Sequence, residues 1–288
     1  MDPRLTPARP DLAATHLKRH IKAEKYTKGH LSQCTLGNVA MRSTPDPGSS
    51  QTSELLFGEH FLILEENDGW AWGQAQYDKY VGYIPVFALS PISHNVHSRI
   101  STPLTWAYSE ADLKSPPLRG LPMGACLPLG EEKKTKGFMH IPDIGWVWEK
   151  HITPLEFHLD YMVLAEKFIN APYLWGGRTA MGMDCSGLSQ ISLGLAGVPL
   201  PRDTDQQEEA LGNDFNIPNW QDKGVLTRGD IVFFPGHVGF MVDDKNLIHA
   251  NATHMATTID PLDKVIEGVS RQENIPVTSI KRLSQKSQ

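Results

Sequence analysis

Turn-forming residues interrupt the apolar sequence at short intervals over most of the first half of the chain. From Gln33 to about Ser90, short apolar runs are separated by polar turns such as STPDPGSS and NDG. Runs this short favour strands over helices, and strands at such close spacing are typical of a small barrel. The residues from about 92 to 154 follow a similar rhythm. The sequence therefore predicts two all-β barrels, at residues 34–91 and 92–155.

Residues 1–33 are predicted to form an extension before the first barrel. Pro3, Pro7 and Pro10 favour an extended path. The segment from Asp11 to Lys25 is predicted to form a short helix, with Asp11 as its N-cap.

The composition changes after Pro154 towards longer periodic segments. Apolar residues between 156 and 170 recur near helical spacing, and a glycine-rich loop then leads into a second helix that starts near Cys185. Gly197 and Pro199 end that helix. Strand-like runs separated by turns follow. Residues 156–288 are therefore predicted to be an α+β domain.

Charge and cysteine content exclude several classes of function. The formal net charge is −6, and no Lys/Arg block is longer than Lys133-Lys134. Nucleic acid and anionic membrane surfaces both require a positive patch, so neither is expected as a partner. The three cysteines contain no CxxC pair, which excludes a disulfide framework or a cysteine-rich zinc site. No metal or organic cofactor is expected, and a small soluble ligand is the favoured partner.

The opening residues indicate where such a chain would work. They contain no apolar core of the length that a secretory signal needs, and no later window approaches the ~18 apolar residues of a spanning helix. The expected location is the cytoplasm.

Cys185 is the strongest candidate nucleophile. The run Met183-Asp184-Cys185-Ser186-Gly187 places this thiol where a loop becomes a helix. Free N–H groups and the positive end of the helix dipole would stabilise a thiolate there. The alternative is a small buried residue near a helix cap. Cys34 and Cys126 lie in strand-like runs, and we expect both only to pack.

Two histidines in neighbouring predicted strands can supply the base and its orienting group. His237 opens the run HVGFMV and His249 closes the run NLIHA. If the hairpin is centred near Asp243, the two histidines lie directly opposite each other on one face. This requires an odd-numbered loop, because a two-residue turn at Asp244-Lys245 would place them on opposite faces. The alternative for each is an ordinary strand histidine.

Six short motifs in this order resemble those of the NlpC/P60 cysteine peptidases. They are Pro172-Tyr173-Leu174-Trp175-Gly176-Gly177, Asp184-Cys185-Ser186-Gly187, Leu200-Pro201-Arg202-Asp203-Thr204-Asp205-Gln206, Gly229-Asp230-Ile231, His237-Val238-Gly239 and Ile248-His249-Ala250. The resemblance implies a papain-like fold with Cys185 as nucleophile, His237 as base and His249 as the orienting residue. It also implies that Tyr173 helps to form the oxyanion site, for which a phenol O–H is a suitable donor.

The two predicted barrels resemble bacterial SH3 domains. Two such modules before an NlpC/P60 domain are similar to the γ-D-glutamyl-L-diamino acid endopeptidases, also called dipeptidyl peptidase VI. That resemblance implies a murein peptide substrate with a free N-terminal L-Ala. In this group the first SH3 domain closes the cleft, so that only two residues fit before the scissile bond.

The resemblance also nominates substrate-binding residues around the nucleophile. Asp184 and Ser186 flank Cys185 as in the family, and Arg202-Asp203-Thr204 matches its RD[ST] motif. Arg202 can pair with a substrate carboxylate or, equally, with Asp203 or Asp205. Trp175 either lines the cleft or packs in the core.

Two residues of the first barrel are further candidates for the cleft. Tyr80 matches a Tyr-x-Gly-aromatic motif in Tyr80-Val81-Gly82-Tyr83. Glu54 is a weaker candidate, and its alternative is a solvated strand residue.

The resemblance thus implies a cysteine endopeptidase that hydrolyses the amide bond between γ-D-Glu and a diamino acid, diaminopimelate or Lys, during murein peptide recycling. One alternative is a secreted hydrolase of intact peptidoglycan with SH3 wall anchors. A second is a catalytically inactive wall-binding protein, and a third is an acyltransferase or amidase on the same fold.

Overall fold

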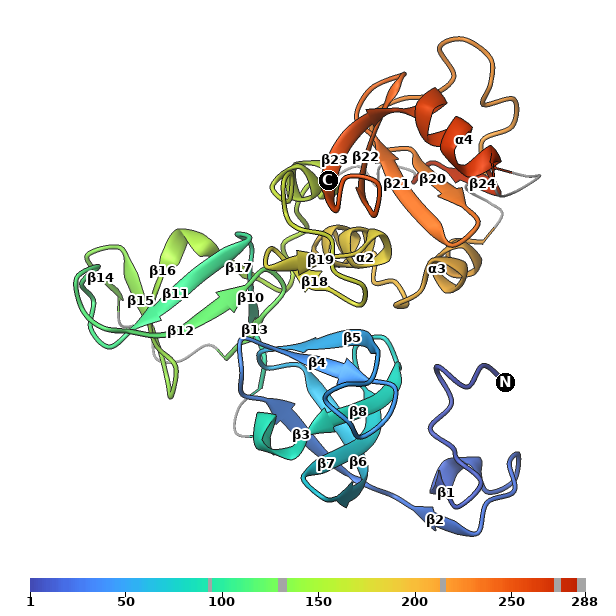
Figure 1. Cartoon of the computed structure of the whole chain (residues 1–288). Coiled ribbons are helices and arrows are strands. Elements are labelled where there is room, and N and C mark those ends of the chain that lie inside the picture. Colours follow the sequence, from blue (N-terminus) through green and yellow to red (C-terminus); the bar gives the residue numbers. More distant parts are fainter. Residues whose placement is uncertain (93–94, 129–133, 213–215, 272–275, 284–288) are drawn as a thin grey trace. The chain divides into compact units, whose positions relative to one another are not determined.

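The computed structural model describes residues 1–92, 95–128, 134–212, 216–271 and 276–283. The chain divides into two compact units, residues 1–156 and 157–288 (Figure 1). This division falls one residue after the predicted boundary at 155/156.

The predicted helix between Asp11 and Lys25 is wrong. Two short parallel strands, β1 (Leu12–Ala14) and β2 (Lys25–Thr27), flank a single 3-10 turn, η1 (Thr15–Leu17). Leu12, Ala14 and Leu17 are buried against Leu64 and Trp72, and this packing favours the strand and the 3-10 turn over a helix.

Asp11 does not cap a helix either. Its carboxylate accepts a hydrogen bond from Arg9 Nη2 at 2.8 Å, and the Arg9 guanidinium lies 4.2 Å from the centre of the Trp72 ring. Asp11 therefore binds Arg9, which is held by its own tertiary contacts, instead of capping a helix.

Residues 30–91 form a seven-stranded antiparallel sheet with the strand order β5-β4-β8-β7-β6-β3-β9. Its core joins residues from both ends of this segment, from Cys34 to Ala88. The strands are β3 (His30–Cys34), β4 (Asn38–Arg42), β5 (Gln51–Leu56), β6 (His60–Asn67), β7 (Trp70–Ala75), β8 (Val81–Pro85) and β9 (Leu89–Pro91), with the 3-10 turn η2 (Val86–Ala88).

The rest of the N-terminal unit is also built from antiparallel strands. They form one three-stranded sheet, β13-β10-β17, and one five-stranded sheet, β12-β11-β16-β15-β14, over a core that includes Ile100, Leu121 and Val147. The elements are β10 (Ser98–Ile100), β11 (Leu104–Tyr108), β12 (Pro117–Pro122), β13 (Cys126–Leu127), β14 (Lys134–Thr135), β15 (Phe138–Ile141), β16 (Gly145–Trp148), η3 (Glu149–His151) and β17 (Ile152–Pro154).

The C-terminal unit is the predicted α+β arrangement of helices followed by an antiparallel sheet. The sheet order is β23-β22-β21-β20-β24, and the apolar side of α4 packs against it (Figure 1). The elements are α1 (Tyr161–Glu166), β18 (Arg178–Thr179), β19 (Gly182–Met183), α2 (Cys185–Leu195), α3 (Thr204–Ala210), β20 (Ile231–Phe234), β21 (His237–Met241), β22 (Asn246–Asn251), β23 (Ala256–Pro261), α4 (Leu262–Ser270) and β24 (Ser279–Lys281).

The β21–β22 hairpin has the odd-numbered loop that the histidine argument required, but its centre is Asp244 and not Asp243. Phe240 pairs with Ile248, and the N–H of Val242 donates to the carbonyl of Asn246. Continued along the strands, this register places Gly239 across from His249. His237 therefore lies diagonal to His249 on the same face, not directly opposite to it.

Among the described residues, no helix is long and apolar enough to span a bilayer.

Candidate active site

Cys185 is the first residue of α2, and the side chain of Asp184 caps that helix. Asp184 Oδ1 accepts the N–H of Gly187 at 2.7 Å, which satisfies one of the free donors of the first turn. Every side chain of α2 is buried, and the helix packs against β21 and β22. The candidate nucleophile therefore lies where a loop becomes a helix, the position that the sequence predicted.

The sulfur of Cys185 lies beside the strand that carries His237. The backbone N–H of Val238, the next residue, is hydrogen-bonded to this sulfur, and Thr204 Oγ1 lies 3.9 Å from it. Burial raises the pKa of the thiol to about 11, and the negative charge of Asp184 acts in the same direction. This direction opposes the thiolate that the helix start favours, because desolvation penalises the charged form of a buried thiol.

The two predicted histidines meet directly. His237 Nε2 and His249 Nδ1 are 2.7 Å apart. Burial, and then the neighbouring His249, lower the pKa of His237 to about 3, so its imidazole is neutral at neutral pH. With Nε2 occupied by His249, Nδ1 of His237 is the nitrogen left to accept a proton from a thiol.

A carboxylate that the sequence reasoning missed completes this row of groups. His249 Nε2 lies 3.0 Å from Asp260 Oδ2, which also accepts the hydroxyl of Thr258 at 2.7 Å. His249 pairs with Thr258 across β22 and β23, so Asp260 lies two residues further along on the same face. The sequence pattern that could have revealed Asp260 is the strand-like run around it. In that run Thr258 and Asp260 are two residues apart and so lie on one face, by the same alternation that was applied to His237 and His249.

Tyr173 lies next to the nucleophile segment. It pairs with Met183 in an isolated bridge, and its N–H donates to the carbonyl of Met255 at 2.8 Å. Burial raises the pKa of its phenol to about 12, and the charges of Cys185 and Asp184 add to this effect. The phenol therefore keeps its proton and remains a hydrogen-bond donor close to Cys185.

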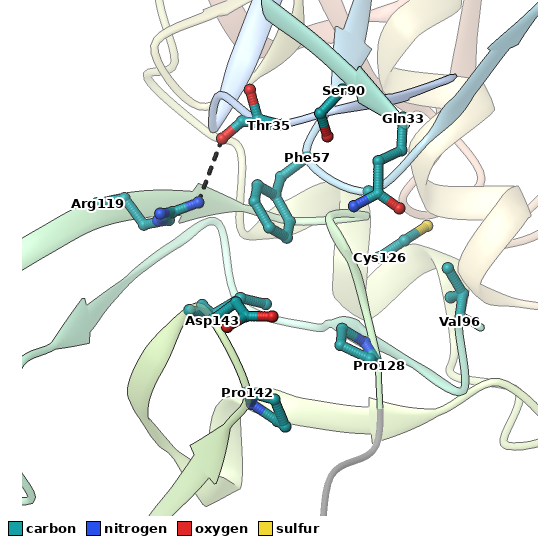
Figure 2. A pocket seen from close by; sticks show the side chains of 12 residues that line it. Gln33, Thr35, Phe57, Ser90, Val96, Arg119, Cys126, Pro128, Pro142 and Asp143 are labelled. Atoms are coloured by element: carbon teal, nitrogen blue, oxygen red, sulfur yellow. Dashed lines mark hydrogen bonds between the residues drawn. The ribbon is translucent and has the colours of Figure 1, made fainter. Parts of the chain in front are cut away.

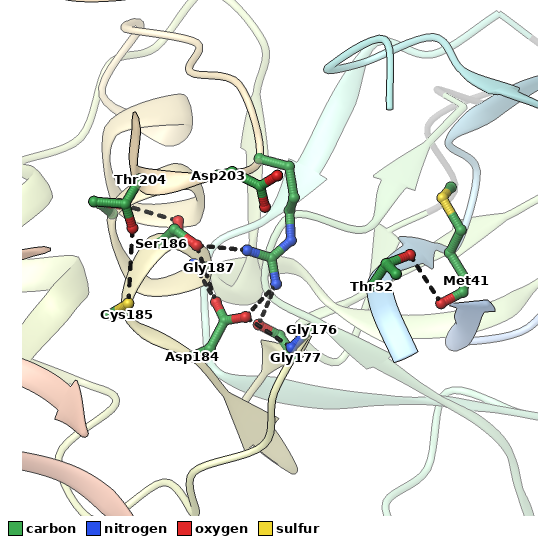
Figure 3. A network of polar contacts seen from close by, with 12 residues as sticks. Met41, Thr52, Gly176, Gly177, Asp184, Cys185, Ser186, Gly187, Asp203 and Thr204 are labelled. Atoms are coloured by element: carbon green, nitrogen blue, oxygen red, sulfur yellow. Dashed lines mark hydrogen bonds and ion pairs between the residues drawn. The ribbon is translucent and has the colours of Figure 1, made fainter. Parts of the chain in front are cut away.

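Asp184, Ser186 and Arg202 form a buried network. Figure 3 shows Asp184 and Ser186 of this network next to Cys185. Arg202 Nη2 donates to Asp184 Oδ2 at 2.6 Å, and Nη1 donates to Ser186 Oγ at 2.7 Å. Asp184 Oδ2 also accepts the N–H of Gly176 at 2.7 Å. Arg202 is only 1% exposed, and its ion pair with Asp184, a partner that the sequence did not name, favours the structural alternative over a substrate carboxylate.

The remaining predicted residues of this unit have separate surroundings. Asp203 is the N-cap of α3, and its N–H donates to Gln206 Oε1 at 3.3 Å. Thr204 is buried against the sulfur of Cys185. Trp175 is 67% exposed, which removes the alternative that it packs in the core.

Tyr80 and Glu54 both lie in the N-terminal unit. Tyr80 packs in the core of the seven-stranded sheet, and its predicted place at the cleft stays a prediction. Glu54 lies on β5 and is buried, not solvated, and its Oε1 accepts Asn38 Nδ2 at 2.7 Å.

A pocket of about 220 Å³ also lies within the N-terminal unit (Figure 2). Its lining includes Phe57, Cys126 and Arg119, whose guanidinium donates to the carbonyl of Thr35 at 3.3 Å. None of the predicted site residues lines it.

Within the part of the chain that the structure describes, no group of three or more His, Cys, Asp or Glu side chains is placed to hold a metal ion.

A cysteine, two histidines and a phenol donor define a cysteine hydrolase, and comparison with known proteins identifies its type. Residues 170–268 match the NlpC/P60 family model, and residues 41–89 match the model of the bacterial dipeptidyl-peptidase SH3 domain. The chain is therefore a cysteine peptidase with an NlpC/P60 domain that follows a bacterial SH3 domain.

Individual relatives are similar over most of the chain. Dipeptidyl-peptidase 6 of Lysinibacillus sphaericus is 24% identical over 76% of this chain and 87% of its own length. The γ-D-glutamyl-L-lysine dipeptidyl-peptidase of Bacillus subtilis is 24% identical over 74% of this chain and 77% of its own length. A crystal structure of an NlpC/P60 family protein from Bacillus cereus superposes with a TM-score of 0.70 at 17% identity, covering 88% of this chain and 99% of that one. It shares the fold.

The buried ion pair leads to a stability prediction. Replacing Arg202 with Ala leaves the carboxylate of Asp184 buried without its cation, and we expect a loss of about 3–5 kcal/mol in the free energy of unfolding. Arg228→Ala is the matched control, because Arg228 makes a partly exposed pair with Glu166 and should lose less than about 1 kcal/mol. Urea denaturation of the two variants measures the difference, and equal losses would contradict the assignment.

Proposed function

We propose that the chain hydrolyses the amide bond between γ-D-Glu and the following diamino acid in peptides derived from peptidoglycan, with a free N-terminal L-Ala on the substrate. The observation that carries this proposal is the row Cys185, His237, His249 in a chain similar to proteins named dipeptidyl-peptidase 6 and γ-D-glutamyl-L-lysine dipeptidyl-peptidase. The diamino acid is diaminopimelate or Lys.

In the first half of the reaction, His237 takes the proton of the Cys185 thiol as the sulfur attacks the γ-carbonyl carbon. The carbonyl oxygen becomes an oxyanion and accepts hydrogen bonds from the backbone N–H of Cys185 and the phenol of Tyr173. The C–N bond then breaks, and the leaving amine takes the proton from His237. A thioester to Cys185 remains.

In the second half, water replaces the amine. His237 accepts a proton from the water molecule as its oxygen attacks the thioester carbon. The C–S bond breaks and the sulfur recovers its proton from His237. L-Ala-γ-D-Glu is released, and its new γ-carboxyl group loses a proton to solvent. The high pKa of the thiol in the resting enzyme supports this order, because thiol and imidazole both start neutral.

We further propose that residues 92–155 form a second SH3-type module. Their two small antiparallel sheets and shared apolar core support this interpretation. A cytoplasmic role in recycling of free murein peptides also belongs to the proposal, since a free N-terminal amine occurs on released peptides and not on stems attached to glycan.

The proposed nucleophile leads to a direct test. Cys185→Ala should lower the release of L-Ala-γ-D-Glu from the tripeptide by at least about 10³-fold, because no other thiol can form the thioester. The matched control is Cys126→Ala, which removes a thiol from the N-terminal unit and should keep wild-type turnover. Product release is measured by chromatography, and folding by circular dichroism. Retained turnover in Cys185→Ala would contradict the proposed reaction.

The free amine of the substrate provides a second prediction. N-acetylation of the tripeptide should lower kcat/KM by at least about 100-fold, because a site that binds an ammonium group loses its charged partner. A glycan-linked stem should be refused for the same reason. Equal cleavage of free and glycan-linked stems would favour a hydrolase of intact wall.

A further inference from the structure

A continuous row of hydrogen bonds extends from His237 to a carboxylate outside the predicted triad. His237 Nε2 and His249 Nδ1 are 2.7 Å apart, and His249 Nε2 lies 3.0 Å from Asp260 Oδ2. We propose that Asp260 is a positioning residue which, through His249, keeps the ring proton of His237 on Nε2 and leaves Nδ1 free to accept the proton of the Cys185 thiol. This inference rests on the proposed roles of Cys185 and His237.

The polarity of the row follows from the chemistry of the carboxylate. Burial alone would raise the pKa of Asp260, but the hydrogen bonds from Thr258 and His249 outweigh it and hold that pKa below its usual range. An ionised carboxylate only accepts hydrogen bonds, so His249 Nε2 must carry a proton. Burial lowers the pKa of His249, so the ring is neutral and its Nδ1 is an acceptor. The partner at 2.7 Å, His237 Nε2, must then be the donor.

Without the carboxylate, the same two rings could hydrogen-bond with the opposite polarity. His249 Nδ1 would donate to His237 Nε2, and the single proton of a neutral His237 would move to Nδ1. That nitrogen could not accept the thiol proton, although no heavy atom had moved. A hydrogen bond to a charged acceptor is strong enough to bias the two polarities by about 10- to 100-fold.

The sheet brings the required groups together on three neighbouring strands. His237 lies on β21, His249 on β22, and Thr258 and Asp260 on β23. Thr258 and Asp260 are two residues apart on β23, and Thr258 pairs with His249 across the strands, so these side chains lie on one face of the sheet. The hydroxyl of Thr258 donates to Asp260 Oδ2 at 2.7 Å and so fixes the carboxylate next to His249.

Other titratable groups around the row must be considered in any pH measurement. His254 Nε2 lies 3.3 Å from Asp260 Oδ1, and its side chain is 48% exposed. Further titratable groups near the row are Cys185 at the start of α2, and Asp184 and Tyr173 in the segment before it. A change in the tautomer of His237 can be separated from their titration because it is read at the ring nitrogens themselves.

The test compares Asp260→Asn with Asp263→Asn in the full-length protein. Asp263 is an exposed carboxylate in the first turn of α4, three residues away. An Asn at 260 can donate to His249 Nε2 and reverse the row, so we expect kcat on the tripeptide to fall about 100-fold, with KM changed less than about twofold. Asp263→Asn should match the wild type.

The protonated ring nitrogens are measured by proton–nitrogen correlation spectra of protein labelled at histidine. In the wild type, His237 and His249 should both show the Nε2–H pattern, and in Asp260→Asn both should shift towards Nδ1–H. The pH profile of Cys185 alkylation by iodoacetamide gives a further readout that needs no peptide substrate. We expect slower alkylation in Asp260→Asn across the neutral range.

Two outcomes would overturn the inference. One is the finding that His249 carries its proton on Nδ1 in the wild type. This measurement does not depend on whether any variant folds. The other is an Asp260→Asn enzyme with wild-type kcat and an unchanged tautomer. Failure of the proposed function is recognised separately, since wild-type protein would then not release L-Ala-γ-D-Glu while its histidine spectra could still be read.

Discussion

The carboxylate of Asp184 is the group on which the geometry of the active site depends. Its oxygens accept the N–H of Gly187 at the start of α2 and the N–H of Gly176 in the preceding loop. Arg202 binds the same carboxylate from a third segment. Three segments that are separate in sequence are therefore fixed by one residue next to Cys185. A buried carboxylate is costly by itself, and Arg202 offsets that cost by the ion pair and its further hydrogen bonds.

The parts of the site that the sequence predicted depend on local rules. Cys185 lies at a helix start because Asp184 is an N-cap, and the histidines share a face because side chains alternate along strands. The errors arise where a distant partner decides. Arg202 pairs with Asp184, 18 residues earlier, a partner that its immediate neighbours in the sequence did not indicate.

The fold shows the same division between local and long-range causes. The antiparallel strands of the N-terminal unit follow from short apolar runs and turns, and they were predictable. The segment after Asp11 has an acceptable helix cap, yet it forms β1 and a 3-10 turn because Leu12 and Leu17 are buried against Trp72. Asp260 was missed for a related reason, since its role is visible only once β23 is paired with β22.

The two carboxylates beside the site have different effects on the charges that the reaction creates. In the proposed reaction, proton transfer from Cys185 to His237 produces a positive imidazolium and a negative sulfur. Asp260, acting through His249, favours the positive charge, whereas Asp184 raises the pKa of the thiol and so opposes the negative one. Arg202 lowers that pKa, because its cation lies against Asp184. Its planar fork donates to both Asp184 and Ser186 at once, which a lysine ammonium on a flexible stem cannot reproduce. Arg202 therefore supports the segment that carries Cys185 through its bonds to Asp184 and Ser186.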